Sequence, residues 1–171
     1  FEINRNFRNE GADSTHSPEF VMIEAYEAYA DYGRMADLTQ ELVQDAALAV
    51  SGSLTVTWAD GTEYDLGGRW DRIRMYESLS AASGREVGPE TPFEELAAWA
   101  AELGIEVRHP IHGKYVEELW EHFVKPDLVR PTFVMDFPVD TSPLVRDHRS
   151  TPGVVEKWDL YTRGFELATG Y

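Results

Sequence analysis

Hydrophobic and polar residues alternate at the start of the chain. Residues 1–8 and 20–26 both alternate with a period of two, and a polar loop containing Gly11 and Pro18 joins them. Alternation of this kind indicates β-strands, and Gly and Pro indicate turns. Residues 7–26 therefore predict a β-hairpin with a long, exposed connection.

The second strand of this hairpin has two unlike faces, because successive side chains of a strand point to opposite sides. The two sets are Val21, Ile23 and Ala25 on one side and Phe20, Met22, Glu24 and Tyr26 on the other. The first set predicts a plain core face. The second combines aromatic rings, a carboxylate and a phenol, which is typical of a sheet face that binds a ligand.

Apolar spacing and turn residues predict the remaining elements. Apolar residues at i, i+3 and i+4 indicate helices, and apolar runs bounded by Gly or Pro indicate strands. The predicted helices are residues 32–50, 76–83, 91–103 and 114–125, and the predicted strands are 54–58, 63–66, 70–75, 131–138 and two within 154–171. The strands come in hairpins rather than in βαβ units, which predicts an α+β fold with helices flanking a largely antiparallel sheet.

One helix start has a specific signature. Thr91 is the predicted N-cap of the helix at residues 91–103, followed by Pro92 at the first helical position. Glu94, three residues after Thr91, would complete a capping box.

The composition restricts the class of protein. The chain has 171 residues, of which 43% are hydrophobic and 12% aromatic, enough for a folded core. It has no cysteine, which excludes disulfides and thiolate metal sites. Because no run of about 18 apolar residues occurs, we expect a cytoplasmic protein whose segment here makes no membrane contact. Both ends fall within strand-like patterns, so we expect a fragment of a longer protein.

The charge argues against a general nucleic-acid surface. The net charge is -16, from 31 acidic and 15 basic residues. Nucleic-acid surfaces need basic patches that displace counterions. Any contact with nucleic acid is therefore expected to be local or to come from another domain.

Charged residues at the end of the first strand form one candidate site. Arg8 offers a planar fork of donors that suits phosphate or carboxylate oxygens. Glu10 shares its face and would orient it or accept from an amine. The alternative is an exposed ion pair, which contributes little. His16, in the loop between the strands, is the histidine best placed for a ligand contact.

A second candidate lies in residues 158–171. A two-residue turn at Thr162 and Arg163 would place Asp159 directly opposite Glu166. Residues directly opposite each other have Cβ atoms about 5 Å apart, so the two carboxylates would repel and a proton, an arginine or a divalent cation must relieve the repulsion. Oxygen ligands of this kind suit Mg²⁺ that bridges substrate phosphates. The alternative is a longer turn with both side chains in solvent.

Several motifs resemble one enzyme family. The chain has no GxSxG, Walker A or GxGxxG sequence. In contrast, FRNEG, THSPEF and MIEAYEAYADY, within residues 7–32, resemble motif 2 of class II aminoacyl-tRNA synthetases, and specifically of their lysine branch. PTFVMDFPVDTSPL and WDLYTRGFELATGY, at residues 131–144 and 158–171, resemble the stretches that precede the third motif of that family.

The resemblance implies a lysine–tRNA ligase reaction. Lysine is activated with ATP to lysyl-adenylate, and the lysyl group is then transferred to tRNA(Lys). Arg8 would act as the catalytic residue, contacting the α-phosphate and the lysine carboxylate, and Phe20 would stack on adenine. The implied sets are Arg8, Glu10, His16 and Phe20 for ATP, Glu24, Tyr26 and Thr169 for lysine, and Asp159 and Glu166 for Mg²⁺. Thr169 stands where relatives often carry an Asn.

The resemblance also implies a partial catalytic domain over residues 1–171. It would comprise the motif 2 hairpin at 1–29, a helical or inserted region at 76–126 and C-terminal strands at 131–171. The anticodon-binding domain, motif 1 and motif 3 would lie outside it, so we expect the chain alone to be inactive and the full-length protein to be a homodimer. Two alternatives are the synthetase part of a membrane-bound lysyl-tRNA synthetase/lysylphosphatidylglycerol synthase and a non-catalytic paralogue acting as a binding module.

Overall fold

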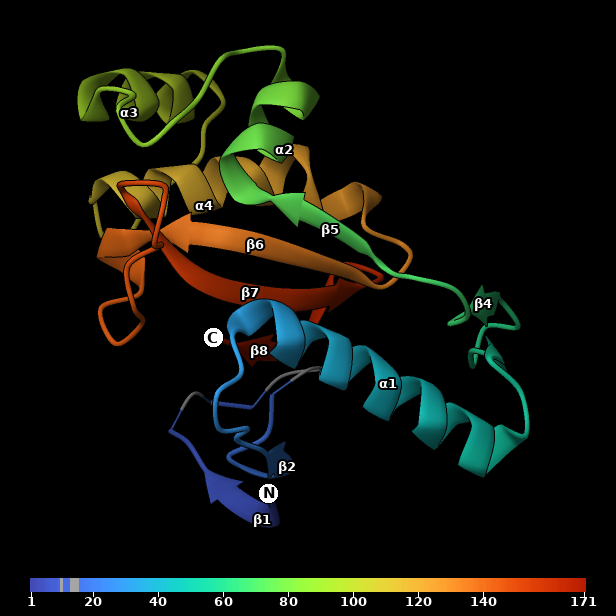
Figure 1. Cartoon of the computed structure of the whole chain (residues 1–171). Helices are drawn as coiled ribbons and strands as arrows, with labels where there is room; N and C mark the ends of the chain where they lie inside the picture. Colours follow the sequence, from blue (N-terminus) through green and yellow to red (C-terminus); the bar gives the residue numbers. More distant parts are fainter. Residues whose placement is uncertain (10, 13–15) are drawn as a thin grey trace. The chain divides into compact units, whose positions relative to one another are not determined.

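The computed structural model describes residues 1–9, 11–12 and 16–171 (Figure 1). These residues form two compact units, Phe1–Ala30 and Asp31–Tyr171. Helices and antiparallel sheets are both present, compatible with the predicted α+β class.

The first unit contains the predicted hairpin. Strands β1 (Glu2–Phe7) and β2 (Glu19–Glu24) pair antiparallel, with Asn6 opposite Phe20. The predicted core face of β2 is wrong, because Val21 and Ile23 are 66% and 45% exposed. A two-stranded ribbon has no second layer of its own that could bury this face.

The second unit is built on a four-stranded sheet with the order β5-β6-β7-β8. Its strands are β5 (Asp71–Arg74), β6 (Thr132–Pro138), β7 (Val154–Thr162) and β8 (Phe165–Gly170). β6, β7 and β8 pair antiparallel, whereas β5 and β6 pair parallel. The parallel pair is possible because the helical region between these two strands provides the long crossover it requires. A separate antiparallel hairpin, β3 (Thr55–Thr57) and β4 (Glu63–Asp65), confirms the one predicted around Asp60-Gly61.

Helices cover both faces of the four-stranded sheet (Figure 1). One face packs on α2 (Met75–Ser83) and α4 (His112–Phe123), and the other on α1 (Tyr32–Ser51). α3 (Phe93–Glu102) packs on the outer side of α4. Val134, Phe137 and Tyr161 belong to the core on the α2–α4 side, and Phe133 and Trp158 to the core on the α1 side. Two short 3₁₀ turns, η1 (Lys125–Asp127) and η2 (Val139–Thr141), flank β6.

The predicted capping box at α3 is wrong. Pro92, with a ψ of 137°, is the N-cap residue, and the helix begins at Phe93. The Thr91 hydroxyl instead accepts a hydrogen bond from the Gly88 N–H at 2.9 Å. Because Pro92 is extended, Thr91 lies one residue too early to cap the first turn.

Candidate functional site

In the hairpin unit, the Arg8 guanidinium lies over the Phe20 ring, 5.5 Å from its centroid. Arg8 follows the end of β1, and its backbone N–H donates to the Pro18 carbonyl, which fixes its position beside β2. Phe20 is half-buried. His16 is exposed in the connection, and Glu10 lies outside the described residues. The pair places a cation beside an aromatic surface.

Glu24 and Tyr26 also lie close together. The Tyr26 hydroxyl donates a hydrogen bond to the Glu24 carboxylate, and both residues are exposed. Glu24 is the last residue of β2, and Tyr26 follows two residues later. The hydrogen bond places their side chains on the same side, as the alternating pattern predicted. A carboxylate and a phenol are thus available to a ligand on this part of the hairpin.

In the sheet unit, Asp159 and Glu166 are not directly opposite, which corrects the predicted register. The turn consists of Arg163 and Gly164, both with positive φ (52° and 74°), so that Thr162 pairs with Phe165 and Tyr161 with Glu166. This turn begins one residue later than predicted, because a Gly favours the second position of such a turn.

A bulge in β8 restores the two carboxylates to one face. Tyr161 pairs with Glu166 but Leu160 pairs with Ala168, which leaves one extra residue in β8. Asp159 is opposite Thr169, so Thr169 and Glu166 lie on the same side of β8 although they are three residues apart. The extra residue therefore brings Asp159, Glu166 and Thr169 to one face.

Asp159 and Glu166 line one cavity of about 270 Å³ between the sheet and α4. Its charged lining residues are Lys114, Glu117, Glu121, Lys157, Asp159 and Glu166. The α4 residues were not predicted as part of any site, because the helical region carries no motif and only the packing of α4 turns them towards β7.

The electrostatics of this cavity centre on Asp159. It is 3% exposed, and the Lys157 ammonium donates to its Oδ2 at 2.8 Å. Its Oδ1 is buried and has no hydrogen-bond partner among the described residues. Partial desolvation and the Asp159 carboxylate raise the pKa of Glu166, although Glu166 itself is exposed. Burial and the same carboxylate raise the pKa of Tyr161.

These residues fit a divalent cation that keeps other ligands. Within the described ranges, no group of three or more His, Asp or Glu side chains is arranged to hold a metal by protein ligands alone. Mg²⁺ in particular binds through one or two carboxylates and completes its shell with water and substrate phosphates. The unpartnered Asp159 Oδ1 and the nearby Glu166 supply such a partial set.

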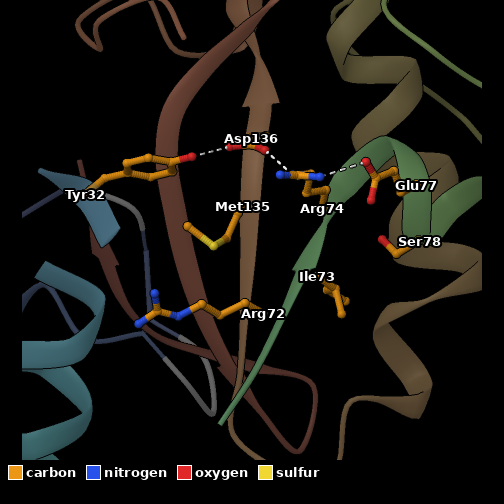
Figure 2. Close-up of a pocket in the computed structure, with 8 residues that line it drawn as sticks. All are labelled: Tyr32, Arg72, Ile73, Arg74, Glu77, Ser78, Met135 and Asp136. Atoms are coloured by element: carbon orange, nitrogen blue, oxygen red, sulfur yellow. Dashed lines mark hydrogen bonds and ion pairs between the residues drawn. The ribbon is translucent and has the colours of Figure 1, made fainter. Parts of the chain in front are cut away.

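A second cavity, of about 600 Å³, lies beside β5 and the start of α2 (Figure 2). Asp136 accepts from the Tyr32 hydroxyl at 3.0 Å and pairs with Arg74 Nε at 3.0 Å. Burial and Asp136 raise the pKa of Tyr32 to about 12. Asp136 has a φ of 63° inside β6, and the register with β7 shifts there. Sequence reasoning missed this cluster, although a charged residue within the apolar stretch PTFVMDFP was a possible signal.

The predicted site residues thus fall into two groups. Arg8, Phe20, Glu24 and Tyr26 lie in the unit Phe1–Ala30, and Asp159, Glu166 and Thr169 lie in the unit Asp31–Tyr171.

No helix in the described part of the chain is both long and apolar enough to cross a bilayer.

Comparison with known proteins identifies the family to which this chain is related. Residues 1–171 match the family model of the tRNA synthetases class II (D, K and N). A Lysine–tRNA ligase of Kineococcus radiotolerans is 65% identical over 173 aligned positions, and one of Mycolicibacterium gilvum is 59% identical over 174. A Lysine–tRNA ligase of Mycobacterium tuberculosis is 53% identical over 178 positions.

The coverage of these matches is asymmetric. They include 100% of this chain but only 35% of each of the three relatives, so the chain spans about a third of their length. A Lysylphosphatidylglycerol biosynthesis bifunctional protein LysX of Nocardia farcinica is 45% identical over the whole chain, which covers 16% of that protein. With its full length matched by the family model, the chain belongs to the class II tRNA synthetases of the D, K and N group.

Proposed function

We propose that this chain supplies part of the ATP and lysine site of a lysine–tRNA ligase. The observation that carries the proposal is the identity of 53–65% over the whole chain to relatives with that name. In the proposed reaction, which we place in the cytoplasm, the lysine carboxylate attacks the α-phosphate of ATP and pyrophosphate leaves. The lysyl group then passes to tRNA.

Arg8 and Phe20 are proposed to bind ATP. The guanidinium over the ring provides a cation for the phosphates and an aromatic surface for the base. As charge develops on the α-phosphate, a fixed Arg8 would stabilise the transition state. Glu10 and His16 are proposed as further ATP contacts.

Glu24 and Tyr26 are proposed to bind lysine. The hydrogen bond between them brings the carboxylate and the phenol oxygen side by side. A lysine ammonium group that leaves water needs a carboxylate and further acceptors of this kind. Thr169 is proposed to assist from β8, on the same face as Asp159.

Asp159 and Glu166 are proposed to hold Mg²⁺. The cation would neutralise phosphate charge when ATP binds. Asp159 would offer its buried Oδ1, which has no partner among the described residues, and Glu166 would lose its unfavourable repulsion with Asp159.

The test is ATP–pyrophosphate exchange with each amino acid in turn, using the full-length protein that contains this chain. We expect lysine alone to support exchange. Exchange driven by a different amino acid and not by lysine would refute the specificity.

A pair of variants tests the lysine contact. Glu24→Gln should lower kcat/KM for lysine about 10- to 100-fold, because a charged hydrogen bond of about 1.5–3 kcal/mol is lost. Glu19→Gln is the matched control: it lies on the same strand, but its side chain pairs with Arg5 at 3.2 Å on the other face. Equal losses in both variants would argue against a role of Glu24 in binding lysine.

A second candidate is the synthetase part of a bifunctional protein, supported by the relative named LysX. Its identity of 45% is lower than that of the lysine–tRNA ligases. Formation of lysylphosphatidylglycerol by the full-length protein, in the presence of tRNA and phosphatidylglycerol, would favour this candidate.

A further inference from the structure

The ammonium group of Lys157 lies in the same cavity as Asp159. It lies on β7 two residues before Asp159, so both side chains point to the same face. Its Nζ is 2.8 Å from Asp159 Oδ2 and 3.8 Å from the centroid of the Phe137 ring. The side chain is 19% exposed. A lysine this enclosed requires a compensating charge, and Asp159 supplies it.

A purely structural ion pair explains only part of this geometry. Buried ion pairs are tolerated when the remaining hydrogen-bonding capacity of both partners is satisfied. Asp159 Oδ1 is buried without a partner among the described residues. One oxygen is thus neutralised by Lys157, and the other is left for a group that the described residues do not supply.

The other lysines near this cavity form ion pairs with glutamates of α4. Lys114 pairs with Glu117 at 2.5 Å, and Lys125 pairs with Glu121 at 2.9 Å. Lys157, in contrast, forms its ion pair with Asp159. Its positive charge also lowers the pKa of Glu166 and so opposes part of the upward shift.

We propose that Lys157 is a resident counter-cation that sets the affinity of the carboxylate pair for a divalent cation. Its ammonium neutralises Asp159 while no cation is bound, and it repels a divalent cation that approaches Oδ1. A cation at Oδ1 therefore binds against the charge of the ammonium at Oδ2, since two positive groups at one carboxylate repel each other. The inference rests on the proposed Mg²⁺ role of Asp159 and Glu166.

The test measures Mn²⁺ binding to the full-length protein by calorimetry and electron paramagnetic resonance, without ATP. Lys157→Met keeps the volume of the side chain and its contact with Phe137 but removes the charge. We expect it to bind Mn²⁺ at least about tenfold more tightly than the parent, because a neighbouring positive charge is gone. Lys157→Arg keeps the charge and should bind as the parent does. Lys114→Met, which removes a charge paired with Glu117, should change the affinity less than about threefold by the same reasoning.

Two further variants make the result decisive. The double variant Lys157→Met with Asp159→Asn should lose the gain, and a gain that persists would place the cation elsewhere and overturn the inference. Lys157→Gln serves as a second neutral variant if the Met variant does not fold, with Mn²⁺-dependent thermal stabilisation as the readout. Affinity equal to that of the parent in the neutral variants, or undetectable in both, also overturns it.

The outcomes separate this inference from the proposed function. A gain in Mn²⁺ affinity without lysine-dependent pyrophosphate exchange would leave the role of Lys157 intact and refute the ligase. Lysine-dependent exchange with unchanged Mn²⁺ affinity in the Lys157 variants would refute the counter-cation alone.

Discussion

At the scale of single residues, Glu166 and Glu156 experience opposite environments on neighbouring strands. Glu166 is exposed at the surface of β8, but partial desolvation and the nearby Asp159 carboxylate raise its pKa, so its charged form is disfavoured in the fold. Glu156 accepts two hydrogen bonds from the Arg149 guanidinium, at 2.6 and 2.9 Å, and these lower its pKa. The two carboxyl groups should therefore influence stability with opposite dependence on pH.

Glu166→Gln, studied in the absence of divalent cations, tests the raised pKa. A raised pKa contributes stability that is present below the ordinary value of 4.5 and is lost as pH rises through the raised pKa. The variant should therefore be more stable than the parent at neutral pH and equal to it at the acidic end. Urea unfolding between about pH 4 and 7.5 measures this difference.

Glu156→Gln is the matched control of opposite sign. A lowered pKa contributes stability that is present above 4.5 and lost as pH falls through the lowered pKa. This variant should lose about 1–3 kcal/mol at neutral pH, because hydrogen bonds to a charged group are removed. A Glu166→Gln variant that is destabilised in the same way would contradict the repulsion between Glu166 and Asp159.

At the scale of elements, the first turn of α4 is held by a residue outside the helix, Asp140 of η2. The Gly113 N–H, in the first turn of α4, donates to Asp140 Oδ2 of η2 at 3.0 Å. A Cβ at Gly113 would overlap Asp140, Pro138 and Thr141. The start of α4 is therefore decided by η2, some 27 residues later in the chain.

Gly113→Ala tests this close approach. Helix propensity alone would stabilise the variant by about 1 kcal/mol, whereas overlap with η2 should destabilise it by about 1–3 kcal/mol. We expect the overlap to dominate, as measured by urea or thermal unfolding. Gly88→Ala is the control, since a Cβ at Gly88 would meet nothing within 4 Å, and it should change stability by less than about 0.5 kcal/mol. A stabilised Gly113→Ala variant would refute the contact.

At the scale of the whole molecule, the net charge of -16 governs encounters with nucleic acid. Phosphate backbones repel an acidic surface, and counterion release requires Lys or Arg on the binding face. We therefore expect this chain alone to bind tRNA no more tightly than about 100 µM at physiological salt. Fluorescence anisotropy with labelled tRNA checks this, with the full-length protein as the comparison. A dissociation constant in the low micromolar range would show that a local basic site overrides the net charge.

The sequence predicted the local features of the fold well. The hairpin of β1 and β2 follows from alternation, the β3–β4 hairpin from Asp60-Gly61, and α1 from its helical spacing. The match of residues 1–171 to the synthetase family confirms the resemblance drawn from the motifs. These features depend on near neighbours in the chain, which is why pattern and propensity suffice.

Register and partners required the tertiary structure. The β7–β8 turn falls at Arg163 and Gly164 and not one residue earlier, and the bulge in β8, not direct opposition, sets Glu166 on the face of Asp159. Thr91 does not cap α3, because an extended Pro92 separates them. A shift of one residue reverses the direction of a side chain, and packing across the sheet selects among such shifts.

The sequence by itself determined the family, most of the helices and strands, and the residue types that we propose for binding ATP, lysine and a cation. Only the tertiary structure decided that Lys157 neutralises one oxygen of Asp159 while the other is buried without a partner among the described residues. It also decided that Asp136 joins Arg74 to Tyr32, which lies 104 residues before Asp136 in the chain. The physical reason is that burial and charge pairing depend on contacts between distant segments, and no local pattern encodes those contacts.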